Sequence, residues 1–269
     1  MVAVFAVLWA RQRTLFMVTM ALGAIAWTIG NGLWLDGAAI FRVVHWWLAF
    51  LVLTIAGERL ELNRVLRPTP WVRMAFVAVL AIIGTALLSS ARRPELSART
   101  LGVGLLLLTA WLLRYDVVRR TVRQRGVTRY MAITLIAGYA WLGIGGVIAL
   151  VTGVTTPGLI YDAMLHAVFL GFVMSMVFAH APVIFPAILA RPLHYGPRFY
   201  LPVGLLHASL ILRIVGDLVD ALGRWRAWGG LLSAVALGLF VLNVGRSVVL
   251  GRRTTQPTRS ASSATAISS

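Results

Sequence analysis

Long apolar blocks, separated by short polar stretches, run along most of the chain. A helix needs about 20 consecutive apolar residues to cross the roughly 30 Å of hydrocarbon in a bilayer. The alternation of apolar and polar residues that is typical of strands is not found. The pattern predicts eight membrane-spanning helices, in approximately residues 14–34, 38–57, 71–90, 100–115, 130–151, 160–189, 199–219 and 228–250.

Irregularities are expected at the two ends of the chain and in the sixth block. Residues 1–9 form an apolar stub that is too short to span, which we interpret as the tail of a truncated crossing. Pro182 and Pro186 predict a kink or an early end of the helix near residue 182. Residues 251–269 are rich in Ser and Thr and predict a disordered cytoplasmic tail. The expected fold class is an all-α, polytopic transmembrane helical bundle that forms a single domain over residues 1–250.

Composition supports a membrane protein and excludes several cofactors. Of the 269 residues, 59% are hydrophobic and only 12% are charged, with a mean hydropathy of +0.86. A soluble domain is typically about half apolar and a quarter charged. Cysteine is absent, which excludes disulfides, thiolate metal sites, iron–sulfur clusters and covalently attached haem.

Arginine accounts for all 25 basic residues, against 8 acidic residues. The connecting segments on one side of the predicted topology carry 17 arginines, and those on the other side carry 5. The positive-inside rule places the arginine-rich side in the cytoplasm. We therefore expect a protein of the bacterial inner (cytoplasmic) membrane with a cytoplasmic C-terminus. The same rule indicates that the arginine-rich segment 119–129 sets the orientation of the protein in the membrane rather than binding lipid or nucleic acid. No nucleic-acid partner is expected.

Ionisable side chains inside apolar segments are costly to bury, and they are therefore the candidates for function. They include Arg42, His45, Asp162, His166, His180, His207, Arg213 and Asp217. In the predicted topology His45 and His166 lie at similar depth, a turn or two below the outer face. Arg42 lies one turn above His45, while Arg213 and Asp217 approach the same side. These groups are expected to converge on one site in the outer leaflet.

A haem site is one interpretation of this group. Asp162 and His166 are four residues apart and share one helical face, a spacing at which a carboxylate can orient a histidine as a ligand. Two histidines from different helices can hold a b-type haem. His45 and His166 therefore predict a haem b site, with Arg42 and Arg213 near the propionates. The alternative is that each histidine hydrogen-bonds to a neighbouring helix and binds nothing.

A second metal site is predicted at His180 and His207. In a protein without cysteine, imidazole suits both haem iron and copper, and the sequence alone does not say which metal this site would bind. His166 and His180 project from nearly one face but lie about 21 Å apart along a straight helix, so they cannot bind one ion. His194 is interpreted as an interfacial residue.

Four short motifs carry a resemblance to a known family. They are IAGERL at 55–60, AGYAWLGIGG at 137–146, LHAVFLGFVMSM at 165–176 and RPL at 191–193. These motifs resemble those of the NnrS family, polytopic bacterial membrane proteins that contain haem and copper and are linked to the response to nitric oxide. His166, Gly171 and Met176 match the family's pattern at the same spacing, and so do Gly57 and Arg59.

The sequence also departs from the family. Two family histidines fall on Ile136 and Ile188, and a family arginine falls on Val183. Family members are longer and have more crossings. His166 is therefore the one candidate ligand that the resemblance carries over.

The resemblance implies a membrane protein that binds haem b and copper and acts in nitric-oxide or related redox stress. Its expected partners are a diatomic gas ligand and a redox protein. A five-coordinate haem at His166 would bind the gas, whereas ligation by His45 as well would favour electron transfer. One alternative is a cofactor-free permease or assembly factor, in which Asp162, Arg213 and Asp217 form a polar pathway or a structural network. Another is a cytochrome-b-like, quinone-reactive subunit. Signatures of soluble enzymes such as GxSxG, the P-loop and HExxH are missing, so no catalytic residue is predicted.

Overall fold

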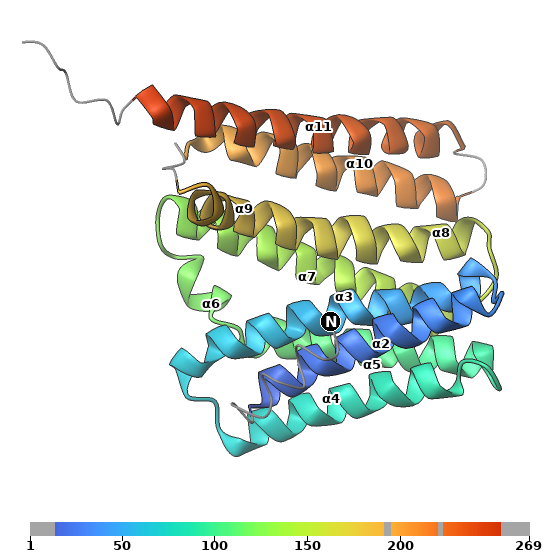
Figure 1. Ribbon diagram of the computed structural model, residues 1–269. Coiled ribbons are helices and arrows are strands. Elements are labelled where there is room, and N and C mark those ends of the chain that lie inside the picture. The colour runs from blue at the N-terminus through green and yellow to red at the C-terminus, as the bar shows by residue number, and fades with distance from the viewer. Residues whose placement is uncertain (1–13, 191–194, 220–222, 254–269) are drawn as a thin grey trace, which may run out of the picture.

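The computed structural model of the chain describes residues 14–190, 195–219 and 223–253, and these form a helical bundle without strands (Figure 1). The predicted N-terminal stub, His194, the RPL motif and the predicted tail from residue 254 onward lie outside the described residues. The elements are α2 (Leu15–Leu35), α3 (Ile40–Leu62), η1 (Asn63–Leu66), α4 (Pro70–Ser89), α5 (Pro94–Tyr115), α6 (Val118–Thr121), α7 (Val127–Thr152), α8 (Leu159–His166), η2 (Ala167–Val173), α9 (Met174–Leu189), η3 (Pro197–Phe199), α10 (Tyr200–Leu218) and α11 (Gly223–Arg253).

The eight predicted crossings are confirmed within the described residues. Eight helical stretches are long and apolar enough to cross a membrane, and each overlaps one predicted block. The fourth starts at Pro94, six residues before the predicted block, because a proline is well tolerated in the first turn of a helix. Many large apolar side chains remain exposed on the bundle surface, as expected for helices that face lipid tails.

Consecutive helices pair as antiparallel hairpins, and α7 lies in the interior of the bundle (Figure 1). The most extensive packing is between α2 and α3, between α10 and α11, between α5 and α7, and between α4 and α5, and α7 also packs against α9. One end of the bundle holds the α2–α3, α4–α5 and α7–α8 connections, on the right in Figure 1. The other end holds α6 and the α3–α4 connection. We call them the α8 end and the α6 end.

The sixth crossing contains an irregularity that the sequence did not predict. Its middle, η2, is a π-helical segment that begins directly after His166. The helix then continues through Pro182 and Pro186 to Leu189. Its last turns are seen nearly end-on in Figure 1, which shows that the helix bends in the part that contains the two prolines, as expected. At the C-terminal end, α11 reaches Arg253, so the first three residues of the predicted tail are helical.

Candidate functional site

Four ionisable side chains from two helices meet at the α8 end of the bundle. Asp162 and His166 come from α8, and Arg213 and Asp217 come from α10; we call them the α8–α10 cluster. The guanidinium of Arg213 donates a hydrogen bond directly to the carboxylate of Asp162. Nε of Arg213 lies 3.5 Å from Oδ2 of Asp217, and Nδ1 of His166 lies 3.4 Å from Oδ1 of Asp162. The expectation that Asp162, His166 and Arg213 converge is therefore met.

Helical spacing and close helix packing create this cluster. Each helix contributes two residues four positions apart, which places both on one face. Glycines on α11 let that helix approach α10 behind the cluster: a Cβ added to Gly229 would lie 2.5 Å from the backbone nitrogen of Arg213, and one added to Gly230 would lie 2.9 Å from its guanidinium. The Arg213 side chain thus lies between α8 and the glycine surface of α11.

Asp217 is the most buried member of the cluster, and its carboxylate is poorly satisfied. Its side chain is 0% exposed, and neither carboxylate oxygen has a hydrogen-bond partner among the described residues. The nearby Nε of Arg213 also makes no hydrogen bond to any residue that the structure describes. A buried carboxylate normally has several donors around it, because an unpaired charge in an apolar interior is costly. Among the described residues, the 3.5 Å ion pair with Arg213 is the one polar contact of the Asp217 carboxylate, which leaves its oxygens able to bind a further partner.

Three side chains of the cluster carry atoms of the kind that can ligate a metal ion. One ligand atom from each of Asp162, His166 and Asp217 lies within 4.8 Å of the other two. Nδ1 of His166 is 2.8 Å from the backbone oxygen of Asp162, an acceptor, so Nδ1 carries the proton in the neutral ring and Nε2 keeps its lone pair. Metal-binding histidines are commonly oriented in this way by a carbonyl or carboxylate partner.

His45 does not join the cluster, contrary to expectation. Its ring packs against that of Tyr161, with centroids 6.3 Å apart, and the Tyr161 hydroxyl lies 3.5 Å from the backbone oxygen of Phe41 on the same helix, α3. Tyr161 and His166 are five residues apart, so they point about 140° away from each other around α8. His45 therefore lies on the α3 side of α8, whereas His166 faces α10.

Haem ligation by the two histidines together does not fit this arrangement. His45 and Arg42 line a separate cavity of about 390 Å³, bounded also by Trp46 and by residues of the α4–α5 and α7–α8 connections. Neither His166 nor Arg213 lines this cavity. Arg42 and Arg213, the two predicted propionate partners, are on different sides of α8.

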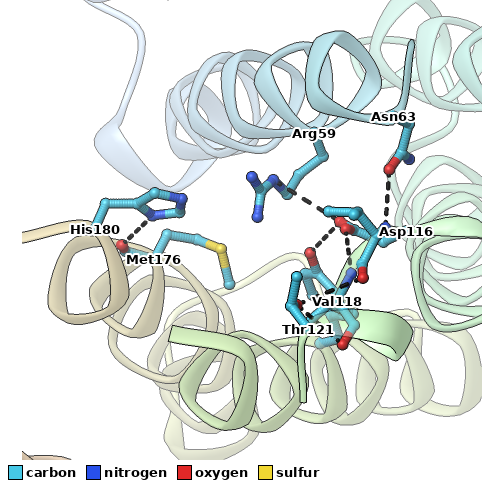
Figure 2. Close-up of polar contacts among 9 residues, drawn as sticks. Arg59, Asn63, Asp116, Val118, Thr121, Met176 and His180 are labelled. Carbon is cyan, nitrogen blue, oxygen red and sulfur yellow. Dashed lines mark hydrogen bonds and ion pairs between the residues drawn. The ribbon is translucent and has the colours of Figure 1, made fainter. Parts of the chain in front are cut away.

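His180 and His207 have different partners, so the structure gives no support to a shared metal site. Nδ1 of His180 lies 2.7 Å from the backbone oxygen of Met176 on its own helix, and its ring points toward Arg59 (Figure 2). His207 instead accepts a 2.9 Å hydrogen bond at Nδ1 from the indole of Trp141, with which it is stacked. Neutral His207 therefore carries its proton on Nε2 and offers no free lone pair to a metal.

A second buried polar network lies toward the α6 end, and most of its residues carry no signal in the sequence (Figure 2). Nε of Arg59 lies 3.8 Å from Oδ2 of Asp116, and both side chains are almost fully buried. The carboxylate of Asp116 also accepts hydrogen bonds from the Tyr139 hydroxyl, at 2.6 Å, and from the backbone N–H of Val118, at 3.0 Å. We call Arg59, Asp116 and Tyr139 the Arg59 network. Only Arg59 was singled out in the sequence, through its family motif, because Asp116 ends an apolar segment and looks like an ordinary loop residue.

Comparison with known proteins gives one family. The sequence model of a family described as "Domain of unknown function (DUF8744)" matches residues 1–249. Because this match spans most of the chain, the protein belongs to that family. No curated protein and no solved structure matches the chain.

Proposed function

We propose that this member of the DUF8744 family is a metal-binding integral membrane protein whose metal ligands are Asp162, His166 and Asp217. The observation that carries the proposal is the carboxylate of Asp217, which is fully buried and accepts no hydrogen bond from the described residues. A divalent cation at this position would satisfy its oxygens.

The two carboxylates of the cluster are the groups that favour a cation. Asp162 and Asp217 contribute two negative charges and Arg213 contributes one positive charge. Arg226 of α11 adds a positive charge near Asp217 from outside the cluster. An uncompensated negative charge in an apolar surrounding is costly, and a bound cation removes this cost. Arg213 would then hold the Asp162 carboxylate in place as an outer partner of the site.

The ligand types suggest which metal is bound. One imidazole and two carboxylates suit divalent first-row transition metals, and copper(II) binds such nitrogen and oxygen donors most tightly. Copper is also one of the metals implied by the resemblance to the NnrS family. The resemblance further supports a role in nitric-oxide or related redox stress, with a diatomic gas and a redox partner, as part of the same proposal.

Metal titration of the purified protein tests the site. Detergent-extracted protein, stripped with a chelator, is titrated with Cu²⁺ and Zn²⁺ in a calorimeter. We expect one metal site per chain, with an affinity that falls roughly 100-fold or more in Asp217→Asn or His166→Ala. Loss of a residue that only orients a metal ligand already lowers metal affinity by about 10–100-fold. Asp36→Asn, an exposed carboxylate in the α2–α3 connection, is the matched control and should leave the affinity unchanged.

Several results would contradict the metal proposal. Equal affinities in the wild-type protein and both site variants would do so, as would the absence of a stoichiometric site in the wild type. The thermal midpoint of each variant shows whether it is folded, and Asp162→Asn serves as a further ligand variant if Asp217→Asn is not. A folded protein without a metal site would leave the cofactor-free permease or assembly factor as the better explanation, with the cluster as a polar pathway or structural network.

A haem held by His45 alone is a second candidate. The observation that favours it is the cavity lined by His45 and Arg42, which provides one imidazole and one guanidinium in an otherwise mostly apolar surrounding. A bound haem would supply a site for a diatomic ligand, with Arg42 beside its propionates. The absorption spectrum of the sample used for titration tests this idea: a Soret band should disappear in His45→Ala and persist in His166→Ala, and a colourless protein would rule it out.

The orientation in the membrane is also part of the proposal. The uneven distribution of arginines supports a bacterial inner-membrane protein with its C-terminus and α6 end in the cytoplasm. We expect a C-terminal green fluorescent protein fusion to be bright and a C-terminal alkaline phosphatase fusion to be inactive. The same reporters inserted at residues 153–158, between α7 and α8, should give the opposite result. Reversed activities would place the α8–α10 cluster on the cytoplasmic side.

A further inference from the structure

A large hollow lies at the α6 end, remote from the α8–α10 cluster. It has a volume of about 780 Å³ and is formed where the α3–α4 connection meets the end of α5 and the α6 segment. Its wall includes five arginines, Arg67, Arg114, Arg119, Arg120 and Arg123. We call this hollow the arginine pocket.

The described residues do not neutralise the positive charge of the arginine pocket. Within the described part of the chain, none of the five guanidinium groups forms an ion pair. Asp116 is the one carboxylate among the described lining residues, and its oxygens already accept hydrogen bonds from Tyr139 and Val118. Arg119 donates to the backbone oxygen of Arg114, so its guanidinium is fixed at the pocket wall. The pocket therefore presents several arginines without a paired carboxylate among the described residues.

Aromatic side chains place the pocket at the level of the membrane interface. Trp71 and Tyr115 line it and are both exposed, and the guanidinium of Arg114 lies over the Tyr115 ring at 5.3 Å. Amphipathic rings of this kind are typical of the headgroup level of a bilayer. Trp111 lies deeper and donates a 3.0 Å hydrogen bond to the backbone oxygen of Val72, which joins α5 to α4 below the pocket.

We propose that the arginine pocket binds a phosphate group, and that its place at the interface selects the headgroup of an anionic phospholipid. Guanidinium groups match phosphate oxygens in geometry and charge, and basic pockets between transmembrane helices hold anionic headgroups in the same way. The inference is independent of the metal site, because the two share no residue. It gives the arginines at 119–123 a binding role in addition to their effect on orientation.

Lipid titration of two matched double variants tests the proposal. Arg120→Gln/Arg123→Gln removes two exposed arginines from the pocket, and Arg92→Gln/Arg93→Gln removes two exposed arginines from the α4–α5 connection at the opposite end. Detergent-solubilised protein is titrated with short-chain phosphatidylglycerol, followed by native mass spectrometry. The pocket variant should bind about 10- to 30-fold more weakly than the wild type, since each arginine contributes about 1 kcal/mol. The Arg92/Arg93 variant should bind like the wild type.

Further probes separate a lipid from a soluble phosphate. Phosphatidylcholine should bind far more weakly, and raising the salt concentration should weaken phosphatidylglycerol binding, as expected for an electrostatic contact. Glycerol 3-phosphate is the soluble probe: if it binds as tightly as the lipid and is lost in the pocket variant, the phosphate site stands but its ligand is a soluble ester. Equal lipid binding by the wild type and the pocket variant, or an equal loss in both double variants, would overturn the proposal.

Discussion

Replacing Asp116 by alanine should lower the free energy of unfolding by about 3–5 kcal/mol, the cost of removing one partner from a buried ion pair. The variant leaves the guanidinium of Arg59, whose side chain is 4% exposed, without its counter-charge. It also removes the acceptor of the Tyr139 hydroxyl and of the backbone N–H of Val118. Loss of stability is measured by denaturation in detergent, followed through tryptophan fluorescence.

Two further variants identify the cause of this loss. Glu61→Ala removes an exposed carboxylate two residues after Arg59 on α3 and should change stability by no more than about 0.5 kcal/mol. The double variant Arg59→Met/Asp116→Leu replaces both charges by apolar groups, and it should recover much of the stability lost in Asp116→Ala. If Asp116→Ala were as stable as Glu61→Ala, the Arg59 network would not be a stabilising element of the bundle.

Replacing Gly102 by alanine should destabilise the crossing of α5 and α7 by about 1–3 kcal/mol, and leucine should cost more. A Cβ at position 102 would lie 2.5 Å from the backbone nitrogen of Leu150 and 2.7 Å from the backbone oxygen of Gly146. These are backbone atoms, so the contact can be relieved only by moving the two helices apart. Small residues at such crossings allow close packing of transmembrane helices.

Gly84→Ala is the matched control for this prediction. Gly84 also lies in a membrane-spanning helix, but a Cβ there would meet nothing within 4 Å. Alanine favours a helix over glycine by up to about 1 kcal/mol, so Gly84→Ala should be neutral or stabilising. Thermal midpoints in the same detergent provide the measurement. A Gly102→Ala protein as stable as Gly84→Ala would mean that the α5–α7 contact is looser than the structure describes.

Several features of the fold followed directly from the order of residues. Blocks of about 20 apolar residues can satisfy their backbone hydrogen bonds in a bilayer only as helices, so eight apolar blocks gave eight helices. The pairing of Asp162 with His166 was equally accessible, because helical geometry places residues four apart on one face. The π-helical turn after His166 was not accessible, since no residue type marks it.

The candidate site depended on packing between helices. Sequence spacing placed His45 and His166 at similar depth, but depth does not say which way a side chain points around its helix axis. Tyr161 faces α3, and helical spacing then turns His166 toward α10. The neighbours of His166 are therefore Arg213 and Asp217 rather than His45.

The sequence by itself determined the fold class, the number of crossings and the identity of the costly polar residues, because each of these depends on local composition and on the thickness of the membrane. Only the tertiary structure decided which of those residues meet. Asp116 contacts Arg59 and Tyr139, and Arg213 of α10 contacts Asp162 of α8, through helix rotations and neighbours that are set by side-chain packing across the whole bundle. A single segment carries no information about such contacts.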